Sequence, residues 1–584
     1  MAMNNKVNFI YMQHISSVRK IAGALFTAIL FSWQMSIHAQ QLDFDEIKVI
    51  APYEPTISDA YKINFNPKIE DTLEVDIQFS YLINPMQIPT QFQLEPITAA
   101  RMRGEPLAKL YNGLVKAGLG NYSTPYLEAF YNTLRSNEFA YGVHLKHISS
   151  GGQIQDYGHS GYSDNKLNLY GKRFTRNHTL HADLNYERNR VHYYGYKRDN
   201  YLDQPAILEY IDTLSKKDIR QRFQYVSPQL GFRSNYLDST KLQHAVDFHY
   251  HWLDDRYDAH EHSLGMKVQL NKSLPSDPLG FAEKQNFNMH FGIDYFNNNT
   301  LLDTANTTLI NIAPTLSSHF RDFTFYVGIN AAAQLDTVSH ARFYPLAGAE
   351  VNLIQNVLIA YASLQGGLHK HNFRDLSTIN PFMNTSVPLR FQNTKSELRG
   401  GFKGSFSSFA SYNLSVANSS IENYAFFVND PTSTLNNRFD VIYDDLRLFN
   451  FRAELFSHIG ERVQVRFASN YYQYTLDNEL EPWHKPNMTL TLSVKYNMQD
   501  KIILSADAFA RNSIYARTFD DMGQVDRVKI HGFHVDTSLG IEYRYTKILS
   551  VFLNLNNVQN QPLERWYNYP SQRFNILGGV SYAF

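Results

Sequence analysis

Residues 488–498 read MTLTLSVKYNM, and their side chains change from apolar to polar at almost every step. Successive side chains of a β-strand point to opposite faces, so this stretch predicts a strand with one apolar and one polar face. The apolar face holds Met488, Leu490, Leu492, Val494, Tyr496 and Met498. The polar face holds Thr489, Thr491, Ser493, Lys495 and Asn497.

The same alternation recurs along the chain, for example in residues 139–146, 287–295 and 533–544. A single strand of this kind also fits a soluble β-sandwich, in which the apolar face packs on a second sheet. Many long strands after an N-terminal export signal, which is described below, favour a membrane barrel instead. In hydrocarbon every backbone amide must pair within the protein, so the sheet must close on itself. The sequence therefore predicts an all-β, transmembrane antiparallel barrel over residues 110–584.

Short and long connections alternate between the predicted strands, as expected when one barrel end faces a confined compartment and the other faces outside. Short, periplasmic turns are expected near Ser136, Asn177, Ser239, Arg321, Gln355, Ser407, Gly460, Asp500 and Thr546, with a longer periplasmic connection around Pro275 to Pro278. Longer, outward loops are expected over residues 150–164, 195–216, 370–391, 428–437, 518–526 and 559–570. The count gives eleven hairpins and 22 strands, or 20 if one pair is merged.

Residues 1–39 carry Lys6, Arg19 and Lys20 without an acid, followed by an apolar core over residues 21–33 and by Ala39 before Gln40. This order predicts a cleaved signal peptide, since the core is too short for a membrane anchor. The expected location is the outer membrane, and the expected partners are its lipid bilayer and the insertion machinery. Without these three cations the chain is net acidic, which disfavours nucleic acid.

Composition excludes several other classes. Aromatic residues make up 14% and charged residues 19% of the 584 residues, and cysteine is absent. The aromatic content argues against a disordered chain, and the lack of cysteine excludes disulfides, thiolate metal sites and a cysteine nucleophile. After residue 35 no run of 18 apolar residues could form a transmembrane helix.

The final residues form an apolar stripe that ends in an aromatic residue. Alternation places Phe574, Val580, Tyr582 and Phe584 on the outward face of the last strand. We interpret this pattern as a C-terminal insertion signal that the outer-membrane assembly machinery reads. An ordinary edge strand would leave Tyr582 and Phe584 exposed as an aggregation hazard.

The end of the chain is similar to the end of TonB-dependent receptor barrels, on the evidence of residues 549–558, 566–570, Arg573 and Phe574. Receptors of this family place a plug domain of well over a hundred residues before the barrel, whereas only residues 40–109 precede the first strand here. Residues 52–60 and 97–107 resemble the leader of plugless, receptor-like barrels of Bacteroidota. The resemblance implies a 22-stranded barrel without a plug and does not imply import driven by TonB.

Residues 40–109 hold seven of the 21 prolines, among them Pro52 and Pro55, which flank Tyr53 and precede Asp59. Proline fixes φ and removes an amide donor, so this segment predicts an extended periplasmic strap rather than a helix. Because a barrel of 22 strands has a wide lumen, we expect the strap to fill the periplasmic mouth or to dock on a partner. A disordered leader is the alternative.

No catalytic, cofactor or metal site is expected. His249 with His251, His260 with His262, and the 369–371 stretch each lack a defined third ligand. No sequence pattern pairs a nucleophile with a base, so a barrel-wall hydrolase is the least favoured function. Trp252, Trp483 and Trp566 lie beside predicted outer loops and suggest an interfacial aromatic girdle, with ligand stacking as the alternative.

Two functions remain open. The first is passage of a solute or polypeptide, with the strap and the outer loops controlling access. The second is a structural barrel subunit in an assembly with other outer-membrane or periplasmic proteins, for example one that inserts or exports proteins.

Overall fold

The computed structural model describes residues 109–584 except 153, 239, 275–283, 301–303, 520–523 and 531. The expected signal peptide over residues 1–39 and the strap residues Pro52, Tyr53, Pro55 and Asp59 lie outside the described residues.

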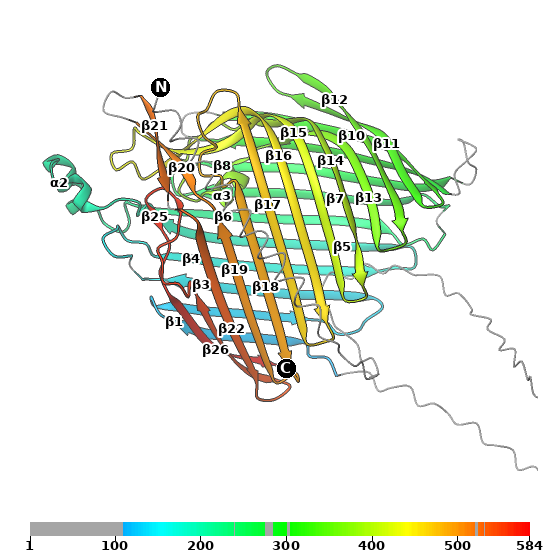
Figure 1. Ribbon diagram of the computed structural model, residues 1–584, viewed down its shortest axis with the longest axis horizontal. Coiled ribbons are helices and arrows are strands. Elements are labelled where there is room, and N and C mark those ends of the chain that lie inside the picture. Colours follow the sequence, from blue (N-terminus) through cyan, green and yellow to red (C-terminus); the bar gives the residue numbers. More distant parts are fainter. Residues whose placement is uncertain are drawn as a thin grey trace, which may run out of the picture. The chain divides into compact units, whose positions relative to one another are not determined.

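The described chain forms a closed barrel of 22 antiparallel strands, which confirms the fold and the strand number expected from the alternation (Figure 1). Each strand pairs with its neighbour, and the last strand returns to the first, where Leu114 lies opposite Ala583. Gly113 and Phe584 exchange two backbone hydrogen bonds of 3.0 Å at this seam. The sheet therefore has no free edge, as a spanning barrel requires.

The barrel strands are β1 (Gly113–Gly120), β2 (Thr124–Asn132), β3 (Phe139–Ser150), β4 (Tyr162–Phe174), β5 (His178–His192), β6 (Arg220–Ser234), β7 (Gln243–Asp255), β8 (His260–Leu274), β9 (Lys284–Asn299), β10 (Thr304–Phe320), β11 (Phe323–Leu335), β12 (His340–Ile354), β13 (Leu358–Lys370), β14 (Phe391–Ser407), β15 (Ala410–Asn429), β16 (Phe439–Ile459), β17 (Val463–Leu476), β18 (Met488–Met498), β19 (Ile502–Arg511), β22 (His534–Arg544), β23 (Leu549–Asn556) and β26 (Asn575–Ala583).

The remaining elements lie in connections between barrel strands. They are two small antiparallel pairs, β20 (Ile514–Phe519) with β21 (Val525–Ile530) and β24 (Glu564–Trp566) with β25 (Tyr569–Pro570), and the helices η2 (Arg198–Tyr201), α2 (Pro205–Thr213) and α3 (Phe373–Ile379). In the part of the chain that the structure describes, none of the helices has the length and apolarity needed to cross a bilayer.

The two faces of the wall differ as the sequence predicted. On β3 the side chains of Phe139, Tyr141, Val143 and Leu145 are all exposed on the outward face. The same holds for Leu539, Ile541 and Tyr543 on β22. A belt of large apolar side chains that no other part of the described chain covers is what a lipid-facing barrel wall requires.

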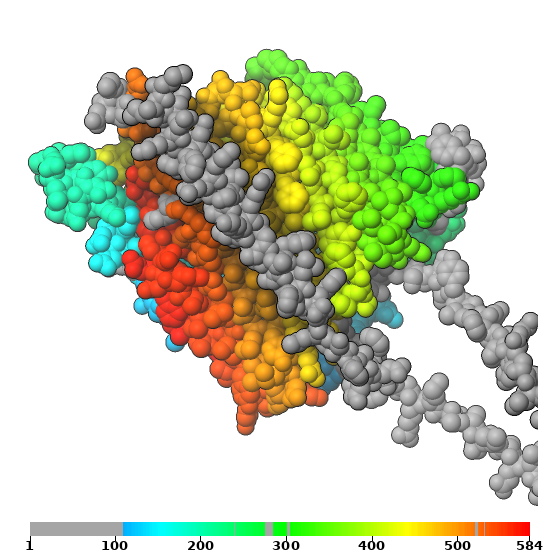
Figure 2. Space-filling model, viewed as in Figure 1, coloured from blue at the N-terminus to red at the C-terminus, as the bar shows by residue number. Residues whose placement is uncertain are grey.

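The two barrel ends differ in their connections. At one end, which we call the turn end, short connections such as residues 175–177, 321–322 and 499–501 join the strands. At the other, the loop end, the long connections lie, among them residues 193–219 and 371–390, and they carry all the helices described above, while a few connections there, such as residues 121–123 and 256–259, are short (Figure 1). Helix α2 projects from the molecule there and has no buried residue (Figures 1 and 2). Where the structure describes them, the expected short turns and long loops lie at opposite ends of the barrel; Ser239, Pro275 to Pro278 and part of 518–526 lie outside the described residues.

Candidate functional site

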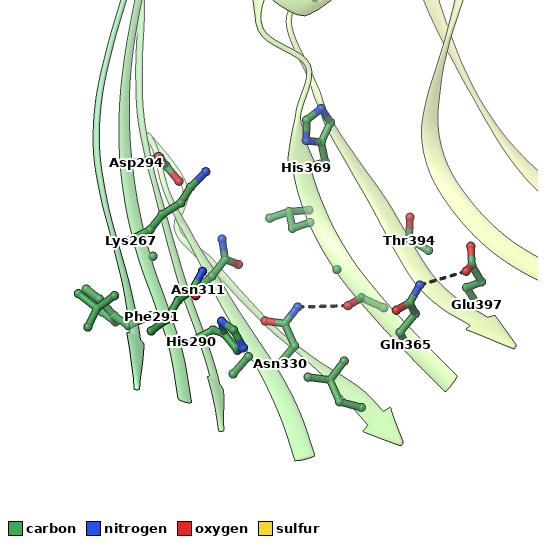
Figure 3. A pocket seen from close by; sticks show the side chains of 18 residues that line it. Lys267, His290, Phe291, Asp294, Asn311, Asn330, Gln365, His369, Thr394 and Glu397 are labelled. Carbon is green, nitrogen blue, oxygen red and sulfur yellow. Dashed lines mark hydrogen bonds between the residues drawn. The ribbon is translucent and has the colours of Figure 1, made fainter. Parts of the chain in front are cut away.

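The lumen contains a polar cavity of about 540 Å³ between β8 and β14 (Figure 3). The polar lining residues alternate along each strand with the outward apolar residues. They include basic, acidic and amide side chains, namely Lys267, His290, Asp294, Asn311, Asn330, Gln365, His369 and Glu397. Such a cavity offers hydrogen-bonding groups of both kinds to a polar solute.

Hydrogen bonds between neighbouring strands hold these side chains in place. The Gln365 Nε2 donates to Glu397 Oε1 over 3.0 Å, and the Asn330 Nδ2 donates to the Gly366 carbonyl over 3.1 Å (Figure 3). His249 lies 2.7 Å from Asp294. This cross-strand network of mixed sign fits the sequence prediction of polar inward residues.

At the loop end of the barrel, several connections pack into a hydrophobic core that we call the cap. The cap consists of the connections 193–219, 371–390, 430–438 and 557–574 together with the strand ends they pack on. Its buried apolar members are Phe223, Leu253, Ala259, Phe373, Leu376, Met383, Val387, Ala425, Phe427, Phe439, Val441, Trp566 and Tyr569. These side chains come from the wall and from several loops, so the loops fold into one body.

Helix α3 is anchored to the wall by a buried carboxylate. Asn372 caps the helix by accepting a 2.7 Å hydrogen bond from the Asp375 amide. Glu261, which is 0% exposed on β8, accepts hydrogen bonds from the Phe373 amide at 2.6 Å and the Arg374 amide at 3.3 Å. A carboxylate at a helix N-terminus satisfies free amides and meets the positive end of the helix dipole.

Further contacts hold the first turn of α3 to neighbouring strands. The imidazole of His251 on β7 lies 3.0 Å from Glu261 Oε1. Arg374 reaches Glu187 on β5 at 2.5 Å and stacks 4.1 Å from the ring centroid of Tyr225 on β6. The helix is therefore fixed to β5, β6 and β8, and His251 on β7 supports the anchoring carboxylate.

Tyrosine hydroxyls and an asparagine connect the loops of the cap to each other. Tyr193 donates its hydroxyl to the Met383 carbonyl at 3.1 Å, and its own carbonyl accepts from the Asn437 Nδ2 at 2.7 Å. Tyr569 donates to the Asn437 carbonyl at 2.5 Å and stacks on Phe382 with 3.9 Å between ring centroids. Burial raises the pKa of Tyr569 well above its ordinary value, so its hydroxyl stays a donor.

His484 joins the neighbouring connection 477–487 to the cap. Its Nδ1 donates to the Phe427 carbonyl at 2.9 Å, while its Nε2 accepts from the Tyr567 amide at 3.3 Å. Only the neutral imidazole fits both bonds. Burial lowers the pKa of His484 from 6.5 to about 4, so the neutral form prevails at pH 7.

The three tryptophans singled out in the sequence occupy different places. Trp483 is 0% exposed, packed on the β15–β16 hairpin, and Trp566 is 6% exposed within the cap beside Phe427. The loops and strand ends of the described chain cover both rings, and their roles as interfacial aromatics stay predictions. Trp252 is half-buried on β7, on the face that also carries the exposed Phe248.

The residues of the expected insertion signal lie on the last strand and its entry. Val580, Tyr582 and Phe584 are about half exposed on the outward face of β26, and Phe574 is half-buried just before β26. The rings of Tyr582 and Phe584 stack with 6.2 Å between centroids. Their role in insertion stays a prediction.

The histidine pairs have separate partners. His260 lies 3.1 Å from Asp254, and His262 accepts or donates a 2.8 Å hydrogen bond with Tyr250, whereas His249 and His251 each contact an acid on the inner face. Within the described residues, no group of three or more His, Asp or Glu side chains is arranged to hold a metal ion.

Sequence reasoning missed Glu261 and helix α3, which together fix the cap. Asn372 followed three residues later by Asp375 is a recognisable helix-start signal and would have located α3. The role of Glu261 could not be found this way, because its partners lie more than 100 residues away in the sequence.

No protein-family model matches this chain, and no curated protein is similar to it in sequence. Solved structures are similar in fold. The siderophore receptor PirA from Acinetobacter baumannii has a TM-score of 0.61 at 8% identity, covering 82% of this chain and 81% of that one. The ferric-catecholate import receptor Fiu from E. coli has a TM-score of 0.59 at 12% identity, covering 82% of both chains.

The FrpB iron transporter from Neisseria meningitidis gives a TM-score of 0.60 at 11% identity, and the match covers 82% of both chains. At these identities the likeness concerns the fold. The chain thus has the 22-stranded barrel of these receptors, and the sequence resemblance to such barrels agrees with this architecture.

Proposed function

We propose that this chain is an outer-membrane barrel that passes a solute or polypeptide through its lumen, and that the cap controls access from outside. The observation that carries the proposal is a lumenal cavity of about 540 Å³ lined by polar side chains, in a barrel whose loop end carries a hydrophobic cap built from several loops.

The apolar belt supports the membrane location. Side chains such as Val143, Leu398 and Ile541 are exposed on the outward face and would meet water if the protein were soluble. We propose the outer membrane with the loop end facing outward, after removal of residues 1–39 as a signal peptide. Trp252, which is half-buried on the outward face of β7, is our candidate for an interfacial aromatic anchor.

We propose that residues 40–109 control access to the lumen from the periplasm. A plugless receptor-like barrel needs another element to prevent leakage, and the proline-rich strap with Pro52, Tyr53, Pro55 and Asp59 is the segment available. We also propose, from the resemblance of this segment, that the chain comes from a member of the Bacteroidota.

Replacing residues 372–389 by a short Gly-Ser linker removes α3 and its loop without touching a barrel strand. We expect the full chain to be nearly silent in a planar bilayer, and the loop-replaced variant to conduct steadily once residues 40–109 are also deleted. The matched control replaces residues 205–213, the exposed helix α2, and should remain silent.

The second candidate function is a scaffold in a larger outer-membrane assembly. Helix α2 favours it, since a projecting helix without a buried residue is free to contact a partner. If the variant that lacks both residues 40–109 and the 372–389 loop does not conduct in the bilayer, passage is contradicted and the scaffold function is left. Steady conductance by the unaltered chain would contradict a closed cap.

A further inference from the structure

Three side chains on the outer wall of the barrel form a hydrogen-bonded chain of the kind that activates a serine. Ser149 Oγ lies 3.2 Å from His147 Nε2, and His147 Nδ1 lies 2.7 Å from Asn165 Oδ1. His147 and Ser149 are two residues apart on β3, so both point to the same face, and Asn165 is the direct partner of His147 on β4.

The orientation of Asn165 decides which nitrogen of His147 carries the proton. The Asn165 Nδ2 donates to Ser163 Oγ at 3.1 Å and to the Arg188 carbonyl at 3.2 Å. Its Oδ1 is therefore the atom that faces the ring, and it accepts from Nδ1–H. This leaves Nε2 unprotonated toward the Ser149 hydroxyl, which is the arrangement of a general base beside a nucleophile.

The group lies where the apolar belt ends. On β3, the exposed Leu145 precedes His147 on the same face, and the exposed Leu127 on β2 is the direct partner of His147. His147, Ser149 and Asn165 are themselves half-buried, so a ligand can reach them from the membrane side. The position is the boundary between acyl chains and headgroups, where the ester bonds of lipids lie.

Basic residues line the next strand on the same face. Arg188 on β5 is the direct partner of Asn165, Arg190 is the direct partner of Ser163, and both arginine side chains are exposed. Guanidinium groups beside the serine suit a substrate that carries a phosphate or carboxylate near its ester.

We propose that Ser149, His147 and Asn165 form a hydrolase site on the barrel wall that cleaves the acyl esters of anionic lipids. Ser149 Oγ attacks the ester carbonyl carbon while His147 Nε2 takes the hydroxyl proton. The bond from that carbon to the alcohol oxygen then breaks, and the alcohol leaves with the proton from His147. The acyl group remains on Ser149.

A water molecule from the headgroup region completes the cycle. It adds to the acyl carbon as His147 takes its proton, the bond to Ser149 Oγ breaks, and the serine recovers the proton while a fatty acid leaves. Asn165 holds the imidazole in the required tautomer and is a positioning residue, and being neutral it avoids an isolated carboxylate beside lipid. Ser163, opposite Ser149, and Arg190 are the nearest donors by register for the developing oxyanion.

A fluorophosphonate probe tests the site without knowledge of the natural lipid. The full chain in mixed micelles should be labelled, with the adduct mapped by mass spectrometry to Ser149, and it should release fatty acid from phosphatidylglycerol. S149A and H147Q should each lose both properties, with hydrolysis falling by at least about 100-fold. Their folding is checked by the heat-dependent shift of the barrel in gel electrophoresis.

H144A is the matched control, because His144 lies on the same strand with its side chain directed to the inner face, where it pairs with Glu128 at 3.0 Å. It should keep full labelling and hydrolysis. Absence of an adduct at Ser149 in the folded, unaltered chain would overturn the proposal and leave the three residues as a polar rim of the wall. Hydrolysis that persists in folded S149A would overturn it equally.

Discussion

The wall and the cap place their large apolar side chains in opposite surroundings. On the wall, residues such as Phe343 (74% exposed) and Leu230 (59% exposed) point away from the described chain. In the cap, residues such as Phe439 and Met383 are 0% exposed. The wall is stabilised by a closed ladder of backbone hydrogen bonds, as hydrocarbon demands, whereas the cap has a buried core like that of a small water-soluble domain.

One chain thus meets two solvents, lipid at the wall and water at the cap, and we expect the two regions to unfold separately. Core burial is the main force in the cap, so a change there should loosen the cap and leave the barrel closed. Changes on the outward wall should act on assembly in lipid and leave the cap unchanged.

The largest effect is expected from Trp566→Ala. The ring packs against Phe427 and Phe439 and is nearly fully buried, so its removal leaves a cavity that costs the cap about 4 kcal/mol. Protease cleavage within residues 371–390 should become much faster, while the heat-dependent gel shift of the barrel persists. Trp252→Ala, on the wall, is the control and should leave this cleavage rate unchanged.

Acid should loosen the cap through His484. The pKa of His484 is about 4 in the folded cap and 6.5 when the cap is open and the ring meets water. Between pH 4 and pH 6.5 the open cap therefore binds more protons than the folded cap. Cap stability is therefore complete above pH 6.5 and falls as the pH drops toward 4, by on the order of 3 kcal/mol. Tryptophan fluorescence of the chain in lipid should report this opening. A His484→Gln variant, which cannot titrate, should show a much weaker response, and an equal response would contradict the role of His484.

A smaller effect is expected from Glu261→Gln. The change removes the charge that accepts two helix amides and faces His251, at a cost of about 2 kcal/mol to the docking of α3. Amide exchange at Phe373 and Arg374 should accelerate. Glu454→Gln, which alters an Arg452 contact on the wall, serves as the control; equal acceleration in both variants would count against the anchoring role of Glu261.

The smallest effect on the finished structure is expected from Phe584→Ala. The ring is 52% exposed, so its loss should change barrel stability by about 1 kcal/mol or less. If Phe584 belongs to an insertion signal, assembly in cells should nevertheless slow markedly, as measured by pulse-chase of the gel shift. Leu119→Ala, at another exposed outward position, should assemble normally.

The sequence predicted the wall far better than the cap. Alternation such as that in residues 488–498 is local and has period two, so it reveals both the strand and the face of each side chain. The cap depends on contacts between distant segments, for example Tyr193 with Met383 and Asn437. Nothing in the local pattern around Trp483 or Trp566 separates a ring buried by loops from one at a lipid interface, so their burial could not be predicted from the sequence.

The wall site was missed for a related reason. His147 and Ser149 are visible in the sequence as a pair on one face, but Asn165 joins them only through the cross-strand register of β3 and β4. A shift of that register by one residue would turn Asn165 to the lumen.

Hydrogen exchange of the unaltered chain in lipid nanodiscs, followed by mass spectrometry over a series of sub-denaturing urea concentrations, compares the two regions directly. We expect the amides of residues 372–389 and 430–438 to exchange through a common opening of lower free energy, while those of β2 to β13 stay protected. A single opening shared by cap and wall, or earlier exchange in the wall, would contradict the division into a lipid-embedded wall and a separately folded cap.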